Sequence, residues 1–301
     1  MENKNIIRVK TITEGHRLAN LPKPKHPLIS IVESGTPKAT PGLQVVMDFY
    51  LISVKRNCNN MQYGQQSYDF DEGLMGFIAP NQIIKSNAQD GNERPTGWML
   101  FIHPDFFWNT PLAKKIKQYE FFGYATNEAL FLSDKEEKIV LEIIRNIENE
   151  YNTNIDKFSQ DIIISHLETL LNYAERFYQR QFITRKITNN KLLNRLEDLL
   201  AAYFNNDELL SSGLPSVQYI ADHLNISPKY LGSMLKQLTG LTTQQHIHEK
   251  LIDKAKEILS TTELSVSEIA YSLGFEHPQS FSKFFKAKTN KSPLEFRQSF
   301  N

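Results

Sequence analysis

The chain has 301 residues, of which 34 are basic and 34 are acidic, so its formal net charge at pH 7 is zero. This length favours two domains, and the charge balance excludes a protein that binds nucleic acid through its overall charge. The single cysteine, Cys58, excludes an internal disulfide and a cysteine-based zinc site. The sequence starts without a signal-peptide pattern and contains no uncharged apolar run of about 18 residues. We therefore expect a cytoplasmic protein with no membrane segment.

The N-terminal part carries short apolar stretches that suit β-strands. They cover residues 28–34, 43–55, 74–80 and 97–104, and glycines and prolines separate them. Strands of this length between turn residues are typical of a small antiparallel barrel or sandwich.

The pattern becomes helical after Pro111. Ser133 and Glu136 have the spacing of a capping box and start a helix that runs to about Tyr151. A longer helix is expected over residues 155–182. Its apolar stripe predicts that it packs in a helical pair and forms part of a symmetric dimer contact. The polar segment 184–190 predicts a linker.

Nothing in the N-terminal part indicates an enzyme. A metal-dependent cupin needs three or four converging ligands, but the strand-rich part up to residue 104 has only His16, His26 and His103, with no H-x-H pair. The sequence also lacks a P-loop, a G-x-G-x-x-G motif and a G-x-S-x-G motif. We therefore expect no catalytic residue, no metal and no cofactor.

The last third of the chain carries one pattern twice. Residues 216–224 read SVQYIADHL and residues 265–273 read SVSEIAYSL, and a second apolar stretch with lysines follows each after a short break. One such stretch is common by chance, but two in register predict a repeated helix-turn-helix. That motif places a helix in the major groove of DNA.

Helix boundaries are marked in both repeats. Ser227 and Pro228 suit the N-cap and the first position of a helix, and Gly240 suits its end. In the second repeat, Ser265 and Glu268 have capping-box spacing.

The two second helices have one apolar and one polar face each. We expect Phe281, Phe284 and Phe285 to be core residues rather than a platform for stacking bases. The outward positions carry lysines and short polar groups that suit phosphates and base edges: Lys229, Ser233, Lys236, Gln237, Gln279, Ser282, Lys283 and Lys286. Lys236 taken alone is equally compatible with a solvated surface lysine. Residues 277–297 hold five basic side chains against one acidic one, a local basic patch.

A helix of 19 residues is expected between the repeats, over residues 242–260. Its length would be about 28 Å. Successive major grooves on one face of DNA lie roughly 34 Å apart. A rigid connector of this length would place both recognition helices in adjacent grooves.

Residues 216–297 resemble the DNA-binding domain of the AraC/XylS family of bacterial transcription regulators. The stretches 220–240, 250–275 and 279–297 carry the resemblance, the last through its Phe-Phe-Lys and closing Ser-Pro…Phe-Arg. The resemblance implies base-contacting positions and phosphate-side positions. The base-contacting positions are Lys229, Gly232 and Ser233 on the first recognition helix and Pro278, Gln279 and Lys283 on the second. The phosphate-side positions are Lys236 and Lys286.

Two departures from the family pattern affect these positions. Gly232 and Ser233 are small where many relatives carry longer side chains, so few direct contacts are expected from the first motif. Pro278 has no backbone N–H to donate. Recognition by the second motif is therefore expected to depend on Gln279 and Lys283.

The resemblance also implies the organisation of the whole chain. The expected fold is α+β, with an N-terminal cupin-like antiparallel β-barrel, a helical dimerisation segment and a C-terminal all-α domain with two helix-turn-helix motifs. The corresponding ranges are 1–183, 184–190 for the linker and 191–301.

The partners considered are double-stranded DNA, a second copy of the chain through the 155–182 helix, a small-molecule effector and RNA polymerase. An N-terminal domain that only dimerises or binds a partner protein is the alternative to ligand sensing. A cupin-type enzyme is a distant third. An enclosed apolar pocket would favour sensing, and a barrel filled by its own side chains would favour interaction.

Overall fold

The computed structural model describes residues 6–33, 44–56, 62–63, 66–67, 73–85, 96–125, 128–153, 156, 158–184, 186–206, 209 and 213–299. The chain divides into two compact units, Met1–Thr184 and Arg185–Asn301. Each unit has its own secondary structure and is described separately.

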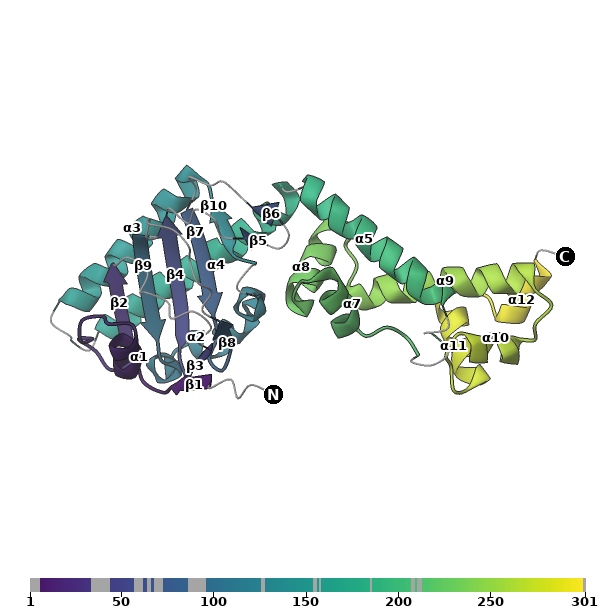
Figure 1. The fold of residues 1–301 in the computed structure, drawn as a ribbon, viewed down its shortest axis with the longest axis horizontal. Coiled ribbons are helices and arrows are strands. Elements are labelled where there is room, and N and C mark those ends of the chain that lie inside the picture. The colour runs from purple at the N-terminus through teal and green to yellow at the C-terminus, as the bar shows by residue number, and fades with distance from the viewer. Residues whose placement is uncertain are drawn as a thin grey trace. The chain divides into compact units, whose positions relative to one another are not determined.

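A five-stranded antiparallel sheet forms the centre of the N-terminal unit (Figure 1). Its strands lie in the order β10 (Leu130–Leu132), β7 (Gly73–Ile78), β4 (Tyr50–Arg56), β9 (Thr96–Ile102) and β2 (Ile29–Glu33). A second sheet joins β1 (Ile6–Val9), β3 (Gln44–Met47) and β8 (Ile83–Lys85), and β5 (Gln62–Tyr63) pairs with β6 (Gln66–Ser67). Each apolar stretch contains a strand, but the stretch 43–55 is divided between β3 and β4, which belong to different sheets.

The described strands do not close into the barrel that we expected. Strands β2 and β10 are the two edges of the five-stranded sheet, and no described pairing connects either of them to the smaller sheet. Closure is not needed to bury this sheet, because other elements cover each of its faces. A layered arrangement, the alternative that the strand pattern also allowed, describes these residues better.

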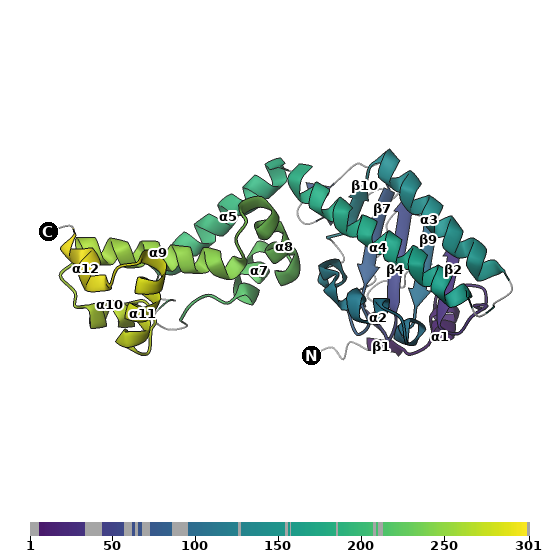
Figure 2. The ribbon, with the colours of Figure 1, turned by 180° about the vertical axis from the view of Figure 1, so that it is seen from behind.

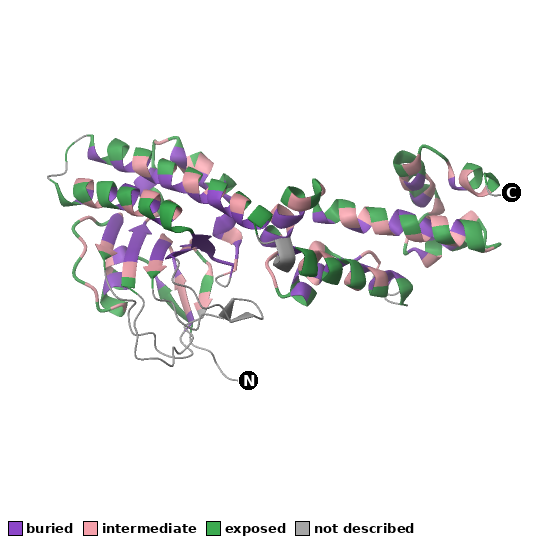
Figure 3. Ribbon diagram, turned by 90° about the horizontal axis from the view of Figure 1, so that it is seen from above, coloured by how far each residue is buried: buried purple, intermediate pink, exposed green. Residues whose placement is uncertain are grey.

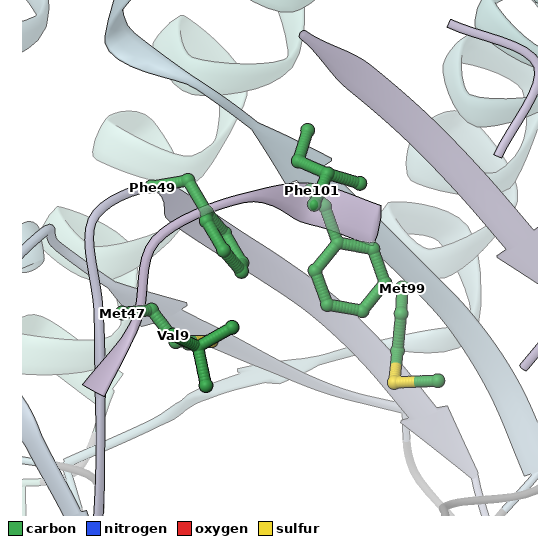
Figure 4. Close-up of a cluster of buried hydrophobic side chains, with 6 residues drawn as sticks. Val9, Met47, Phe49, Met99 and Phe101 are labelled. Atoms are coloured by element: carbon green, nitrogen blue, oxygen red, sulfur yellow. The ribbon is translucent and has the colours of Figure 1, made fainter. Parts of the chain in front are cut away.

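Alternating side chains divide the sheet into two apolar faces. On one face, Met99 and Phe101 of β9 form a buried cluster with Val9, Met47 and Phe49, joined by Ile12 of α1 (Ile12–Leu18) (Figure 4). The side chains of this cluster fill the space between the two sheets around β9.

Helices cover the opposite face. Phe77, Ile52 and Leu100 are register neighbours across β7, β4 and β9, and the Phe77 ring lies 6.2 Å from that of Tyr178. Tyr178 belongs to α4 (Ser159–Thr184), which packs along α3 (Asp134–Asn152) over the sheet (Figure 2). In Figure 3 both helices alternate between buried and exposed positions along their length.

The capping box expected at the start of α3 is confirmed, since Ser133 and Glu136 bond reciprocally. The next helix begins later than expected, at Ser159, and Ile155 lies outside the described residues. The first apolar residues of the predicted stripe stay in solvent: Phe158 is 56% exposed and Ile162 is 41% exposed. The core stripe therefore starts at Ile163.

Short helical segments connect β9 to β10. They are η1 (Pro104–Phe107), α2 (Leu112–Lys115), η2 (Ile116–Gln118) and η3 (Glu120–Gly123).

The segment that we expected to be a linker is largely helical. Helix α4 extends to Thr184 and α5 (Lys186–Asn205) begins two residues later. Polarity suggested a linker at 184–190, and this stretch contains no glycine or proline, the residues that most strongly end a helix. Polar residues alone do not prevent a helix from continuing.

The described residues of the C-terminal unit are all helical or in short connections. After α5 come α7 (Val217–Leu224), α8 (Pro228–Thr239), α9 (Thr243–Thr261), α10 (Val266–Ser272), α11 (Pro278–Thr289) and α12 (Pro293–Gln298). Helix α9 is the axis of the unit and contacts α5, α8, α10 and α12. The α7–α8 pair lies toward one end of α9 and the α10–α11 pair toward the other (Figure 1). In the part of the chain that the structure describes, no helix is long and apolar enough to span a bilayer.

Candidate nucleic-acid interface

Helix α8 is positioned by a tightly capped turn. Ser216 and Ser227 each accept a hydrogen bond from the backbone N–H three residues later, which starts α7 and α8. Asn225, with φ of 58°, ends α7 in the left-handed conformation, and Gly240, with φ of 77°, ends α8 in the same way. The caps predicted at Ser227, Pro228 and Gly240 are confirmed.

Helix α11 is positioned by a similar arrangement. Ser265 and Glu268 form the predicted capping box at the start of α10, and the hydrogen bond from Ser265 lowers the pKa of the Glu268 carboxyl below its usual value. Gly274, with φ of 78°, makes the turn between the helices, and a Cβ there would lie 3.0 Å from the Leu209 carbonyl oxygen. Asn290, with φ of 60°, ends α11.

The buried faces of both helices fix which residues point outward. Phe281 and Phe285 are completely buried in α11, as expected, whereas Phe284 is only half-buried. On α8, Leu231, Met234 and Leu235 are buried and Leu238 is half-buried. Tyr230, which the sequence pattern did not select, is buried as well; its position four residues before Met234, on the same helix face, was the available signal.

All nine residues predicted to contact DNA lie on the outer sides of α8 and α11. Five of them are exposed: Lys229, Lys236, Gln279, Lys283 and Lys286. Gly232, Ser233, Pro278 and Ser282 are half-exposed and lie between them. Each helix therefore presents exposed lysines, joined on α11 by Gln279, on the side opposite its buried face.

One basic residue of the predicted patch has an internal role. Arg297 donates to the carbonyl oxygens of Leu259, at 3.1 Å from Nε, and Leu264, at 2.7 Å from Nη2. These bonds connect α12 to the last turn of α9, where a cation is favourable for the helix dipole. Arg297 keeps its charge in the patch, but these bonds fix its side chain, so the lysines of α11 and the following turn are the cations with free side chains to offer a phosphate.

Helix α9 connects the two motifs as a single helix. It has 19 residues and begins with the capping box of Thr242 and Gln245, which gives it a length of about 28 Å. Its His248 ring packs edge-on against Phe284, with centroids 5.1 Å apart. Burial and, secondarily, the charge of Lys288 lower the pKa of His248, which favours the neutral ring at this contact.

Residues 220–299 match the family model described as a helix-turn-helix domain. The transcriptional activator RhaS of Escherichia coli O1:K1 is 37% identical over 109 residues, which are 36% of this chain and 35% of RhaS. RhaS of Escherichia coli K12 matches to the same extent. The chain thus matches about a third of the length of these curated relatives.

Solved structures resemble part of the chain. A transcriptional regulator with an AraC-type DNA-binding domain from Chromobacterium violaceum is 22% identical, with a TM-score of 0.34, over 38% of this chain and 96% of that one. The C-terminal domain of AraT from Geobacillus stearothermophilus is 29% identical, with a TM-score of 0.32, over 36% of this chain and 84% of that one. The C-terminal unit therefore contains a helix-turn-helix domain that is similar in sequence to part of the transcriptional activator RhaS, and the match supports a DNA-binding regulator of the AraC/XylS type.

Proposed function

We propose that the chain regulates transcription by binding a specific DNA sequence through α8 and α11. The observation that carries this proposal is the pair of capped helix-turn-helix motifs at the two ends of α9. A connector of about 28 Å is close to the roughly 34 Å between successive major grooves on one face of a duplex. One chain would then occupy two grooves.

The exposed side chains divide into two roles. On α11, Gln279 suits the paired donor and acceptor of adenine, and Lys283 suits the two acceptors of guanine. Lys229 on α8 lies near the helix start, where base contacts are usual in this motif. Lys236 and Lys286 lie later on their helices and suit phosphates. Pro278 contributes shape alone, and Ser282 contributes one hydroxyl group.

The base-contacting role predicts a loss of sequence discrimination. In the full chain, Gln279→Ala and Lys283→Ala should each weaken binding to a duplex selected from a random library by about 1–3 kcal/mol. Binding to a scrambled duplex should change much less. Fluorescence anisotropy at fixed salt measures both affinities.

Lys236→Ala is the matched control for a phosphate contact. It should weaken binding to the selected and the scrambled duplexes about equally, and reduce the slope of log K against log salt by about one unit. A folded fragment of residues 185–301 that binds no duplex at low salt would contradict the proposed function. Circular dichroism of the fragment establishes whether it is folded.

We further propose that α4 contributes to a symmetric dimer. The supporting observation is that Phe158 and Ile162, which lie at its start, and Ile183, near its end, are 41–56% exposed in the described unit. Sedimentation of the full chain should give a dimer at micromolar concentration. Phe158→Glu combined with Ile162→Glu should shift the mass toward the monomer without loss of helical content; an unchanged dimer would exclude this end of the helix as the contact.

The role of the N-terminal unit has two candidates. For ligand sensing, the structure offers a cleft of about 270 Å³ beside His26, Phe106, Tyr151 and Gln160, which both apolar and polar groups line; it is not the enclosed apolar pocket that would favour this role. A role in protein interaction, including contact with RNA polymerase, is supported by the self-filled cluster of Met47, Phe49, Met99 and Phe101 and their neighbours. Thermal unfolding with candidate metabolites separates these roles, since a ligand of the folded state raises Tm.

A further inference from the structure

Gly232 lies in the middle of α8, where a glycine is unfavourable. Glycine makes a helix interior less stable than alanine does, because its backbone loses more freedom on folding. Gly232 is not at a helix end, and it is not among the residues with positive φ, such as Gly240. Its backbone therefore does not require glycine.

Packing within the protein does not require glycine either. A Cβ atom placed on Gly232 would meet no atom of the described residues within 4 Å, so alanine would fit without displacing anything. By comparison, a Cβ on Gly73 would lie 2.8 Å from the Glu137 side chain. What limits the size of residue 232 is therefore expected to lie outside the folded unit.

The surface around Gly232 is bare at its centre. Ser233 is next to it, and its hydroxyl donates to the Lys229 carbonyl oxygen at 3.0 Å, so this donor is already used within the helix. Lys229 and Lys236 are exposed at either end of this surface. The middle of the outward face of α8 thus consists of helical backbone and the Cα methylene group of Gly232.

The second recognition helix is different at the matching positions. The repeat pairs Leu231 with Phe281, so Gly232 corresponds to Ser282 and Ser233 corresponds to Lys283. Lys283 is exposed on α11, whereas α8 offers no long side chain at that place. The two motifs therefore present unlike surfaces to DNA.

We propose that Gly232 lets the backbone of α8 lie directly against base edges in the major groove, so that the first motif recognises DNA by steric fit. A surface without hydrogen-bonding side chains suits an apolar edge, for which the thymine methyl group is the matching chemistry. Hydrogen-bonded base recognition is then left to α11 and to Lys229 at the start of α8. This inference rests on the proposed function, because it requires α8 to enter the groove.

The test compares Gly232→Ala and Gly232→Gln with the wild-type full chain. Native-state hydrogen exchange should show stronger protection of α8 in the alanine variant, because helix propensity rises and nothing in the unit is displaced. Affinity for the selected duplex should nevertheless fall about fivefold or more, as expected when a methyl group is added to a closely packed contact. The glutamine variant should lose at least as much affinity for the selected duplex. Replacing thymine by deoxyuridine under α8 should lower the affinity of the wild type more than that of either variant.

Ser267→Ala is the control, since it changes an exposed helical residue on α10, outside both recognition helices. It should leave the affinity for the selected duplex unchanged. Gly232→Ala binding as tightly as the wild type would overturn the inference, as would tighter binding by Gly232→Gln or weaker protection of α8. If Gln279→Ala and Lys283→Ala also left DNA binding unchanged, the proposed function itself would be wrong.

Discussion

Replacing Phe285 by alanine is expected to destabilise the C-terminal unit by about 3–5 kcal/mol, the usual cost of truncating a buried phenylalanine. Phe285 is completely buried, and its ring lies 5.8 Å from that of Phe281 and 5.5 Å from that of Phe296. The substitution would leave a cavity where α11 meets α12. Because domains have only about 5–15 kcal/mol of stability, much of the second motif's stability would be lost.

Chemical denaturation of the full chain and hydrogen exchange of α10–α12 measure this effect. Leu294→Ala is the matched control: Leu294 lies on α12 but is 59% exposed, so its truncation should change stability by about 0.5 kcal/mol or less. Specific DNA binding should weaken in the Phe285 variant in proportion to the unfolded fraction. A loss of less than 1 kcal/mol would mean that the α11–α12 core is not packed as described.

Helix boundaries in the C-terminal unit could be predicted because their signals are local. Ser227, Gly240 and the pair Ser265–Glu268 act within one helical turn, so sequence spacing is enough to identify them. The internal role of Arg297 could not be predicted. Its partners are carbonyl groups 33 and 38 residues away, which only the tertiary fold brings near.

The N-terminal unit shows the same difference between features set by local sequence and features set by distant contacts. Apolar stretches between glycines and prolines located four strand-forming regions, but the pairing order β10-β7-β4-β9-β2 depends on non-local contacts that no residue pattern specifies. This is why the strand-forming regions were predicted, whereas the division of 43–55 between two sheets and the lack of closure among the described strands were not. The exposed surfaces of α8 and α11 were predicted from helical periodicity, whereas the half-buried Phe284 depends on its contact with His248 of α9.

Replacing Gly97 by alanine is expected to disrupt the N-terminal unit. Gly97 has φ of +147°, and a Cβ there would lie 2.0 Å from the Val54 carbonyl oxygen. That oxygen belongs to the backbone of β4, which pairs with β9 along its whole length, so no side-chain rotation can relieve the clash. Backbone strain and steric overlap together should cost roughly 3 kcal/mol or more.

Gly76→Ala is the matched control in the neighbouring strand β7. A Cβ on Gly76 would approach only the Ser53 hydroxyl, at 3.0 Å, which can rotate away, and the backbone there has no positive φ. Denaturation of the full chain should therefore show a large loss for Gly97→Ala and a small one for Gly76→Ala. If the N-terminal unit forms the dimer, sedimentation should show a monomer for Gly97→Ala but not for Gly76→Ala. The affinity of the Gly97 variant for a selected duplex should also fall, although α8 and α11 are unchanged. A stable, dimeric Gly97 variant would contradict both the strand register at Val54 and the need for glycine in β9.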